Sequence, residues 1–583
     1  MKSLLGNAAR YQVAQFCLVN GLSLLFAEDV RIDNLVGLAA KQYHFFGQNF
    51  VILKHWCIVS KKTPLSSYTG LMDFFRERWF LLPILSAALL ILALPPINFW
   101  PLVALALAPL FYAVCINQKA RTWEVVRLGA LTGSFLIFSL YYLTLFQFHW
   151  LPGSEGLVML VRAGIVPATL FGAALLGLCL YLYSHLRTPY ITLNALLGGL
   201  AYLAFELVFT ALFQGYYTGT LGYTLAPVPF MMSLASLGGV TFVSFIVAAF
   251  SCLVAEVATV RGSLSVHNKL GVAALLGSVM VLSLGNTLYL SQPSPLEQSV
   301  SVAIVQWGSS ERMVFGEEVP ATLAGHSFEQ VDLVVYPLSF FDGILYEDTP
   351  PSAPFAVLPL ERAGEWVAAA FPGGTTVVTW DSVVRNNTLY NTFEFWKDGS
   401  IVAEYKKQSL HFLDSTPAWL ENSGVYSSPF AYEVGEEPGP TEVAGVSIGA
   451  LICSELVDGD VVAAQAEGAS FLLSIGSEAM FVDDTIGHYS LRAAQFRAAE
   501  YNVPVIRTSV LGPSALIDRR GRLLAYAPWG ERHVLMGEVE LREPRPTVYA
   551  QVGHLPLLLL GSVVLAVALY VRRRAKFLRT REQ

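Results

Sequence analysis

Long apolar runs fill much of the first half of the chain, and one further run lies near its end. A run of about 20 apolar residues is long enough to cross the hydrocarbon core of a bilayer as a helix. The pattern predicts eight membrane spans, at 80–95, 99–115, 128–149, 157–183, 190–212, 228–258, 270–290 and 553–571. The span at 228–258 is long enough to be tilted or to extend beyond the bilayer.

Basic residues are distributed unevenly among the loops that join these spans. The loops 96–98, 150–156 and 213–227 contain no Lys or Arg, whereas the alternate loops and the tail 572–583 do contain them. Short loops rich in Lys and Arg stay in the cytoplasm. We therefore expect both chain ends in the cytoplasm and residues 291–552, between the last two spans, on the extracytoplasmic side.

Beyond residue 300, short β-branched runs replace the long apolar ones. These runs lie at 301–305, 332–336, 375–380, 446–452, 469–474 and 503–508, with helix-like segments at 317–329, 359–371, 457–467 and 486–501. Short apolar runs bounded by turn residues are typical of buried strands. Their alternation with helices predicts an α/β domain around a buried sheet.

The hydrophobic pattern divides the chain into five parts. They are an N-terminal extension 1–79, a seven-helix membrane domain 80–290, the α/β domain 291–552, a last transmembrane helix 553–571 and a basic tail 572–583. The extension lacks the basic, apolar and small-residue pattern of a signal peptide. Met72 stands just before the first span, so translation starting there is one hypothesis, and a genuine cytoplasmic extension is the other.

Composition adds two expectations. The net charge of −7 and the mean hydropathy of +0.52 give no reason to expect a nucleic-acid partner. The histidines of the α/β domain show no paired spacing, and the domain has no pair of cysteines, so we expect no metal and no cofactor.

Cys453 is the cysteine with the most informative position. Of six cysteines in the chain, it alone lies in the α/β domain, so it has no disulfide partner there. It ends the apolar run 446–452 and precedes the helix-like segment 457–467, and a helix N-terminus favours a thiolate. The sequence therefore favours a nucleophile, with a small core residue as the alternative.

Seven motifs, in this order and spacing, resemble one known family. They are Leu94–Pro101, Val302–Gln306, Tyr390–Asn391, Tyr405–Lys407, Ile452–Glu455, Arg497–Glu500 and Arg507–Ala515. The chain resembles apolipoprotein N-acyltransferase, a bacterial inner-membrane enzyme with a nitrilase-type domain inserted before its last helix. The resemblance implies an αββα sandwich for 291–552 and a periplasmic position for it.

The resemblance also implies a chemistry. Cys453 would attack a phospholipid ester and hold the acyl chain as a thioester, with Lys407 stabilising charge and Glu455 in a supporting acidic position. The acyl acceptor would be the N-terminal amino group of a diacylated lipoprotein, and the protein would act as a monomer. For Lys407 the alternative is an ordinary surface lysine, and for Glu455 a helix cap.

The chain departs from the family pattern at three positions. The family's general base follows a Pro at a strand end, where this chain has Leu338. A second family Glu, eight residues after the lysine, is Ser415, with Asp414 beside it, and the Tyr after the nucleophile is Ser454. A leucine side chain cannot accept a proton.

Leu338 leaves open which group replaces the base and whether the chain is active. Asp342, Glu347 or Asp348, just after Leu338, could supply a substitute carboxylate. Cys is the nucleophile that depends least on a base, so acyl transfer would be slowed and not abolished. The alternatives are a catalytically impaired family member that acts as a membrane-anchored binding or assembly protein, and a hydrolase or amidase that uses the same thiol.

Overall fold

The structure is a computed structural model of the chain. It describes residues 81–95, 97–116, 155–212, 220–260, 263–292, 296–308, 328, 330–337, 344–347, 357–371, 374–410, 414–415, 421–422, 431–436, 439–478, 484–542 and 545–582. The extension 1–79, the predicted span 128–149 and the residues Leu338, Asp342 and Asp348 lie outside this described part.

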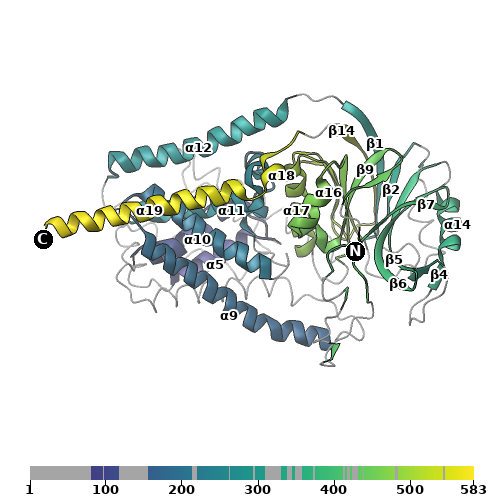
Figure 1. Cartoon of the computed structure of the whole chain (residues 1–583), viewed down its shortest axis with the longest axis horizontal. Coiled ribbons are helices and arrows are strands. Elements are labelled where there is room, and N and C mark those ends of the chain that lie inside the picture. The colour runs from purple at the N-terminus through teal and green to yellow at the C-terminus, as the bar shows by residue number, and fades with distance from the viewer. Residues whose placement is uncertain are drawn as a thin grey trace, which may run out of the picture. The chain divides into compact units, whose positions relative to one another are not determined.

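The membrane part is built from apolar helices (Figure 1). They are α5 (Leu81–Ala93), η2 (Trp100–Leu102), α6 (Val103–Ala106), α7 (Ala108–Ile116), α9 (Glu155–Leu186), α10 (Ile191–Leu212), η3 (Leu221–Leu225), α11 (Pro229–Ala258), α12 (Val266–Ser291) and α19 (Leu555–Glu582). Helices occupy seven of the eight predicted spans. Within the described residues, α10, α11, α12 and the first part of α19 are long and apolar enough to cross a membrane, so the total of eight spans stays a prediction.

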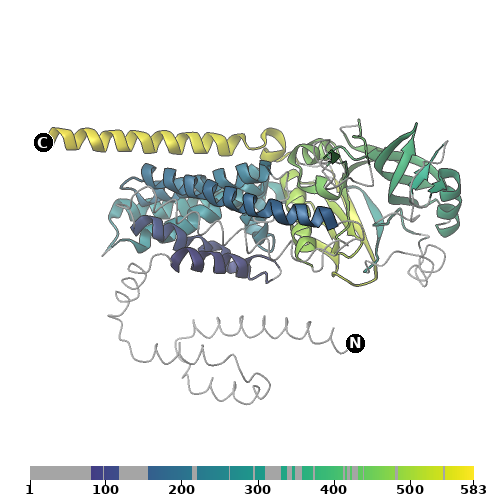
Figure 2. The same cartoon turned by 90° about the horizontal axis from the view of Figure 1, so that it is seen from below.

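The long helices differ in how deeply they are buried. In α11, 67% of the most apolar window is buried inside the protein, against 6% in α12 and 17% in α19. α11 packs against α7, α10, α12 and α17 (Thr485–Tyr501), whereas α19 lies along the edge of the helices (Figure 2). Exposed apolar faces on α12 and α19 suit contact with lipid chains.

α11 is broken near its first third. Gly238 and Gly239 have non-helical dihedrals, and Gly239 has a φ of 77°. A Cβ atom at Gly239 would lie 2.7 Å from the ring of Tyr549, so this contact requires glycine. The long apolar run that predicted a tilted or overlong span is therefore two helical segments joined at a kink.

The α/β domain contains two sheets. Their strands are β1 (Leu296–Gln306), β2 (Leu333–Val335), β3 (Ile344–Tyr346), β4 (Val357–Pro359), β5 (Thr376–Arg385), β6 (Thr388–Lys397), β7 (Ser400–Lys406), β8 (Thr441–Val443), β9 (Val446–Ile452), β10 (Phe471–Gly476), β11 (Val505–Ser509), β12 (Ser514–Ile517), β13 (Leu523–Ala527) and β14 (His533–Arg542). One sheet has the order β14-β1-β2-β5-β3-β4, with β6 and β7 continuing from β5, and the other has the order β13-β12-β11-β10-β9-β8.

The two sheets pack face to face between layers of helices. Ile304 and Phe393 of the first sheet share one core with Ile452 and Leu473 of the second. α14 (Leu360–Ala370) covers the outer face of the first sheet, and α16 (Gly459–Ala466) and α17 cover that of the second. The described residues thus form the αββα sandwich that the resemblance implied.

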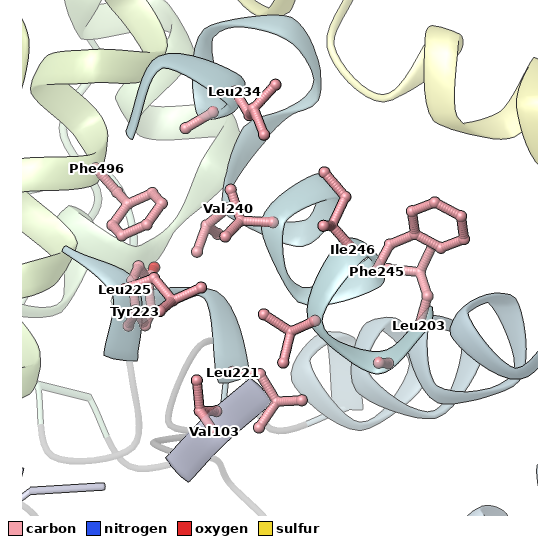
Figure 3. Packing of buried hydrophobic residues seen from close by; sticks show 14 of the residues in the cluster. Val103, Leu203, Leu221, Tyr223, Leu225, Leu234, Val240, Phe245, Ile246 and Phe496 are labelled. Carbon is pink, nitrogen blue, oxygen red and sulfur yellow. The ribbon is translucent and has the colours of Figure 1, made fainter. Parts of the chain in front are cut away.

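α17 lies between the second sheet and the membrane helices. Figure 3 shows Phe496 of α17 pointing toward Tyr223 of η3 and Val240 of α11. The rings of Phe496 and Tyr223 meet edge to face with centroids 5.5 Å apart. One apolar cluster therefore joins the α/β domain to the apolar helices of the membrane part.

Candidate active site

Cys453 stands at a sharp turn directly after β9. It begins η4 (Cys453–Val457) and has a φ of 53°, a left-handed conformation that is uncommon for residues other than glycine. Its side chain is partly exposed, in contrast to the three buried cysteines of the described membrane helices. Such strain is common where a reactive side chain is presented at the end of a strand.

The surroundings of Cys453 keep its thiol protonated at rest. Burial raises the pKa of the Cys453 thiol, Lys407 lowers it, and the carboxylates of Glu478 and Asp414 raise it. A backbone hydrogen bond from Ser477, just beyond β10, favours the thiolate. A nucleophile in this state needs a group that accepts its proton.

Lys407 follows β7 and is directed into the domain. Its side chain is 1% exposed, and its Nζ lies 2.7 Å from Oδ2 of Asp414. Lys406, in contrast, lies over the ring of Tyr390 and pairs with Glu404. The two adjacent lysines therefore have different surroundings, and Lys407 is the one that influences the Cys453 thiol.

Asp414 is buried beside Lys407. Its residue is 6% exposed, and its Oδ1 accepts a hydrogen bond of 3.4 Å from Nδ2 of Asn391. The backbone N–H of Lys407 donates to the carbonyl of the same Asn391. Ser415, at the position where the family pattern has its second Glu, follows Asp414 in the chain.

Glu455 ties the turn at Cys453 to the segment that carries Lys407. Its carboxylate accepts hydrogen bonds from the backbone N–H groups of Ile452 (2.7 Å), Gln408 (2.7 Å) and Ser409 (3.1 Å), and from the hydroxyl of Tyr405 (3.1 Å). Burial raises the pKa of Glu455 to about 7. These contacts fix the Glu455 side chain between the two segments.

Two family models and several relatives match the chain. A model described as the apolipoprotein N-acyltransferase N-terminal domain matches residues 86–253, and one described as carbon-nitrogen hydrolase matches 324–549. The chain is similar to the apolipoprotein N-acyltransferases in both its membrane part and its α/β domain. The second model spans Cys453, Lys407 and Glu455. Together with relatives named as N-acyltransferases, it supports an enzyme of the acyltransferase type.

Two relatives align with the chain along nearly their whole length, and a third aligns over a short segment. The chain is 24% identical to an apolipoprotein N-acyltransferase of Haemophilus influenzae, over 86% of this chain and 98% of the relative. It is 27% identical to one of Azotobacter vinelandii, over 85% and 95%. A third, from Bradyrhizobium diazoefficiens, is 36% identical over 21% of this chain and 22% of the relative.

The carboxylates of Glu478 and Glu347 are engaged by arginines. Glu478, which the sequence did not single out, pairs with Arg507 at 2.5 Å and also accepts a hydrogen bond from Ser509. Glu347, a predicted substitute base, is half exposed and pairs with Arg385 at 3.1 Å. Among the described carboxylates, Asp414 is therefore the one in contact with Lys407.

Proposed function

We propose that the protein transfers an acyl chain from a membrane phospholipid, through a thioester on Cys453, to the N-terminal amino group of diacylglyceryl-cysteine in lipoproteins. The relatives carry the name apolipoprotein N-acyltransferase, which supports lipoprotein N-acylation as the general reaction. The observation that carries the mechanism is the strained, partly exposed Cys453 influenced by the buried pair of Lys407 and Asp414.

The first half-reaction forms the thioester. Asp414 accepts the thiol proton, and the sulfur attacks the ester carbonyl carbon of the phospholipid. The C–S bond forms, the ester C–O bond breaks, and the proton passes from Asp414 to the departing alcohol, which leaves as a lysophospholipid. Lys407 stabilises the negative charge that develops on the carbonyl oxygen.

The second half-reaction transfers the acyl chain. The amino nitrogen of the lipoprotein attacks the thioester carbonyl, the C–N bond forms and the C–S bond breaks. The amine proton passes through Asp414 to the sulfur and restores the thiol. Metal and cofactor have no part in this scheme.

We assign the base role to Asp414 because it contacts Lys407, which acts on the Cys453 thiol, although its two oxygens also accept hydrogen bonds from Asn391 and Lys407. Both oxygens of Glu455 accept hydrogen bonds that hold the backbone, and both oxygens of Glu478 are held by Arg507 and Ser509. Asp414 faces the lysine that stabilises the reaction. General-base assistance contributes about 10²–10⁴-fold in rate.

The proposal includes the membrane arrangement. We propose eight spans, with cytoplasmic ends and an extracytoplasmic α/β domain, at a bacterial inner membrane. The apolar runs support the number of spans, the loop charges support the orientation, and the resemblance supports the inner membrane. Apolar α12 and α19, exposed along their length, support a lipid environment next to the domain. The comparisons give no support to the alternative of an impaired assembly protein.

Complementation tests the function directly. The chain is expressed in a strain depleted of its own apolipoprotein N-acyltransferase, beside Cys453→Ala. Growth with the parent and none with Cys453→Ala is expected, and mass spectrometry should find a phospholipid-derived acyl thioester on Cys453 of the parent. A well-expressed parent that neither supports growth nor carries the thioester would refute the proposal.

A further inference from the structure

Three arginines are buried in the described part of the α/β domain, and they differ in whether a carboxylate pairs with them. Arg497 pairs with Glu500 at 3.1 Å, and Arg507 pairs with Glu478 at 2.5 Å. Arg492 is 7% exposed and has no carboxylate partner among the described residues. A buried charge is costly unless an opposite charge accompanies it.

Of the two terminal nitrogens of Arg492, one has a hydrogen-bond partner among the described residues. Its Nη2 donates to Oδ1 of Asn98 at 2.6 Å, whereas its Nη1 is buried and has no partner in the described part of the chain. Burial lowers the pKa of Arg492 to about 10, because no anion offsets the loss of water. The group remains a cation at neutral pH.

A second donor without a partner lies one turn away. Tyr489 precedes Arg492 by three residues on α17, so both side chains lie on the same face of the helix. Tyr489 is 6% exposed, and its hydroxyl has no partner among the described residues. A charged donor and a neutral donor are therefore both left without an acceptor.

These two donors lie where the α/β domain meets the membrane helices. Asn98 belongs to the turn between α5 and η2, and hydrogen bonds from Asn98 to Leu94 (2.9 Å) and from Trp100 to Asn98 (2.8 Å) fix that turn. Its neighbours Ile97 and Trp100 are 45% and 37% exposed. Exposed aromatic and aliphatic side chains of this kind favour the interface between lipid and water.

We propose that Arg492 and Tyr489 bind the phosphate group of a membrane phospholipid, with Asn98 holding the guanidinium in place. A phosphate oxygen is a strong acceptor for both donors, and arginine matches its geometry and charge. We favour a phospholipid over a soluble anion because the exposed Ile97 and Trp100 lie in the turn that holds Asn98, and such side chains favour the interface between lipid and water. That this lipid is also the acyl donor rests on the proposed function.

α17 connects this site to the nucleophile. The helix packs against η4, which begins at Cys453, and against η3 of the membrane part. A headgroup held on α17 would therefore lie on the element that supports the nucleophile's turn. The phosphate contact would orient the donor before the ester reaches Cys453.

Lipid binding is measured on full-length Cys453→Ala protein, which cannot form the thioester. The protein is freed of lipid in a phosphate-free detergent, and its melting temperature is followed during titration with dioctanoyl phosphatidylglycerol, dioctanoylglycerol or inorganic phosphate. The phospholipid should stabilise the protein at lower concentration than either of the other two. Adding Arg492→Gln should weaken its apparent affinity about tenfold, the order expected for a lost hydrogen bond to a charged group.

Three further variants complete the test. Tyr489→Phe should weaken phospholipid affinity a few-fold, as about one neutral hydrogen bond. Arg492→Lys keeps the charge but not the planar donors, and should fall between the parent and Arg492→Gln. Arg522→Gln, at an exposed arginine paired with Asp518, is the matched control and should bind as the parent does.

Two results would overturn the site. One is an Arg492→Gln protein that binds phospholipid as tightly as the parent, and the other is equal affinity for dioctanoylglycerol or inorganic phosphate. The proposed function fails separately, when the native chain forms no thioester although its phospholipid binding depends on Arg492.

Discussion

The region around Cys453 and the junction between α17 and α11 both bury charged side chains, but these side chains contact different parts of the protein. At the junction, Oε1 of Glu500 accepts the backbone N–H of Val240 at 2.7 Å, just after the kink in α11. Arg497 pairs with Glu500 and donates to the hydroxyl of Tyr223 at 3.2 Å. Each group at the junction thus holds a fixed part of the backbone or a neighbouring helix.

Around Cys453, the buried ion pair does not include the sulfur atom. Lys407 and Asp414 pair with each other, while the Cys453 thiol is kept neutral by burial. Changes at the junction should therefore affect stability, and changes around Cys453 should affect rate. The following predictions test whether changes at the junction leave the reaction rate of the folded protein unchanged, while changes around Cys453 lower it.

The largest effect is expected from Asp414→Asn. Because Asp414 is the proposed base, the rate of thioester formation per folded molecule should fall by about 10²–10⁴-fold. The melting temperature should also fall, because Lys407 loses its buried partner. The remaining reaction should depend on spontaneous ionisation, so its rate should rise about tenfold per pH unit below the thiol pKa. Single-turnover acylation followed by mass spectrometry, across a pH series, gives both quantities.

Two controls accompany this variant. Asp460→Asn changes an exposed carboxylate on α16 and should react as the parent does. Leu338→Glu in the Asp414→Asn background returns a carboxylate to the family's position and should recover part of the lost rate. An Asp414→Asn protein with the parent's rate and pH profile would remove Asp414 from the mechanism.

The next effect concerns the junction. Glu500→Gln removes one partner of a buried ion pair, which typically costs about 3–5 kcal/mol of stability. Hydrogen exchange should increase in the α11 segment around Val240, and the melting temperature should fall. The folded fraction should still form the thioester on Cys453, because Glu500 does not contact it.

The control for the junction is Glu467→Gln, at an exposed position after α16. It should leave hydrogen exchange around Val240 and the melting temperature unchanged. If Glu500→Gln instead slowed acylation of folded protein while exchange around Val240 stayed the same, the junction would belong to the catalytic machinery and the distinction between the two regions would fail.

The two regions also differ in how far the sequence could predict them. Cys453, Lys407 and Glu455 lie in short motifs near strand ends, so local pattern and resemblance located them, and the structure brings Lys407 near Cys453. Lys407 pairs with Asp414, one residue before the position where the family pattern has its second Glu. This pairing depends on the path of the chain after β7, which the sequence pattern did not predict. The role of Glu478 depends on Arg507, which lies on a neighbouring strand.

The junction could not be predicted from local pattern. Val240 and Glu500 are 260 residues apart in sequence, and only tertiary packing brings them together. The break at Gly238 and Gly239 lies inside the apolar run 228–258, which the length of the run predicted as one span. Helical segments were predictable because hydrophobicity over a span is a local property, whereas the contact that orients α17 on α11 is not.

The smallest predicted effect concerns Glu455, which links the two elements of the site. Its pKa is raised by burial to about 7, above the value of an unfolded glutamate near 4.5, so the folded protein binds its proton more tightly. The contribution of this proton to the free energy of unfolding is fully present below about pH 4.5 and is lost as pH rises toward 7. Over this range the free energy of unfolding should fall by at most about 1.4 kcal/mol per pH unit. Glu455→Gln cannot titrate, so the difference in melting temperature between parent and variant should change over this pH range and become constant above it. A difference that stays constant from pH 4.5 to 7 would show that Glu455 is ionised throughout, and would make it a fixed anion beside Lys407.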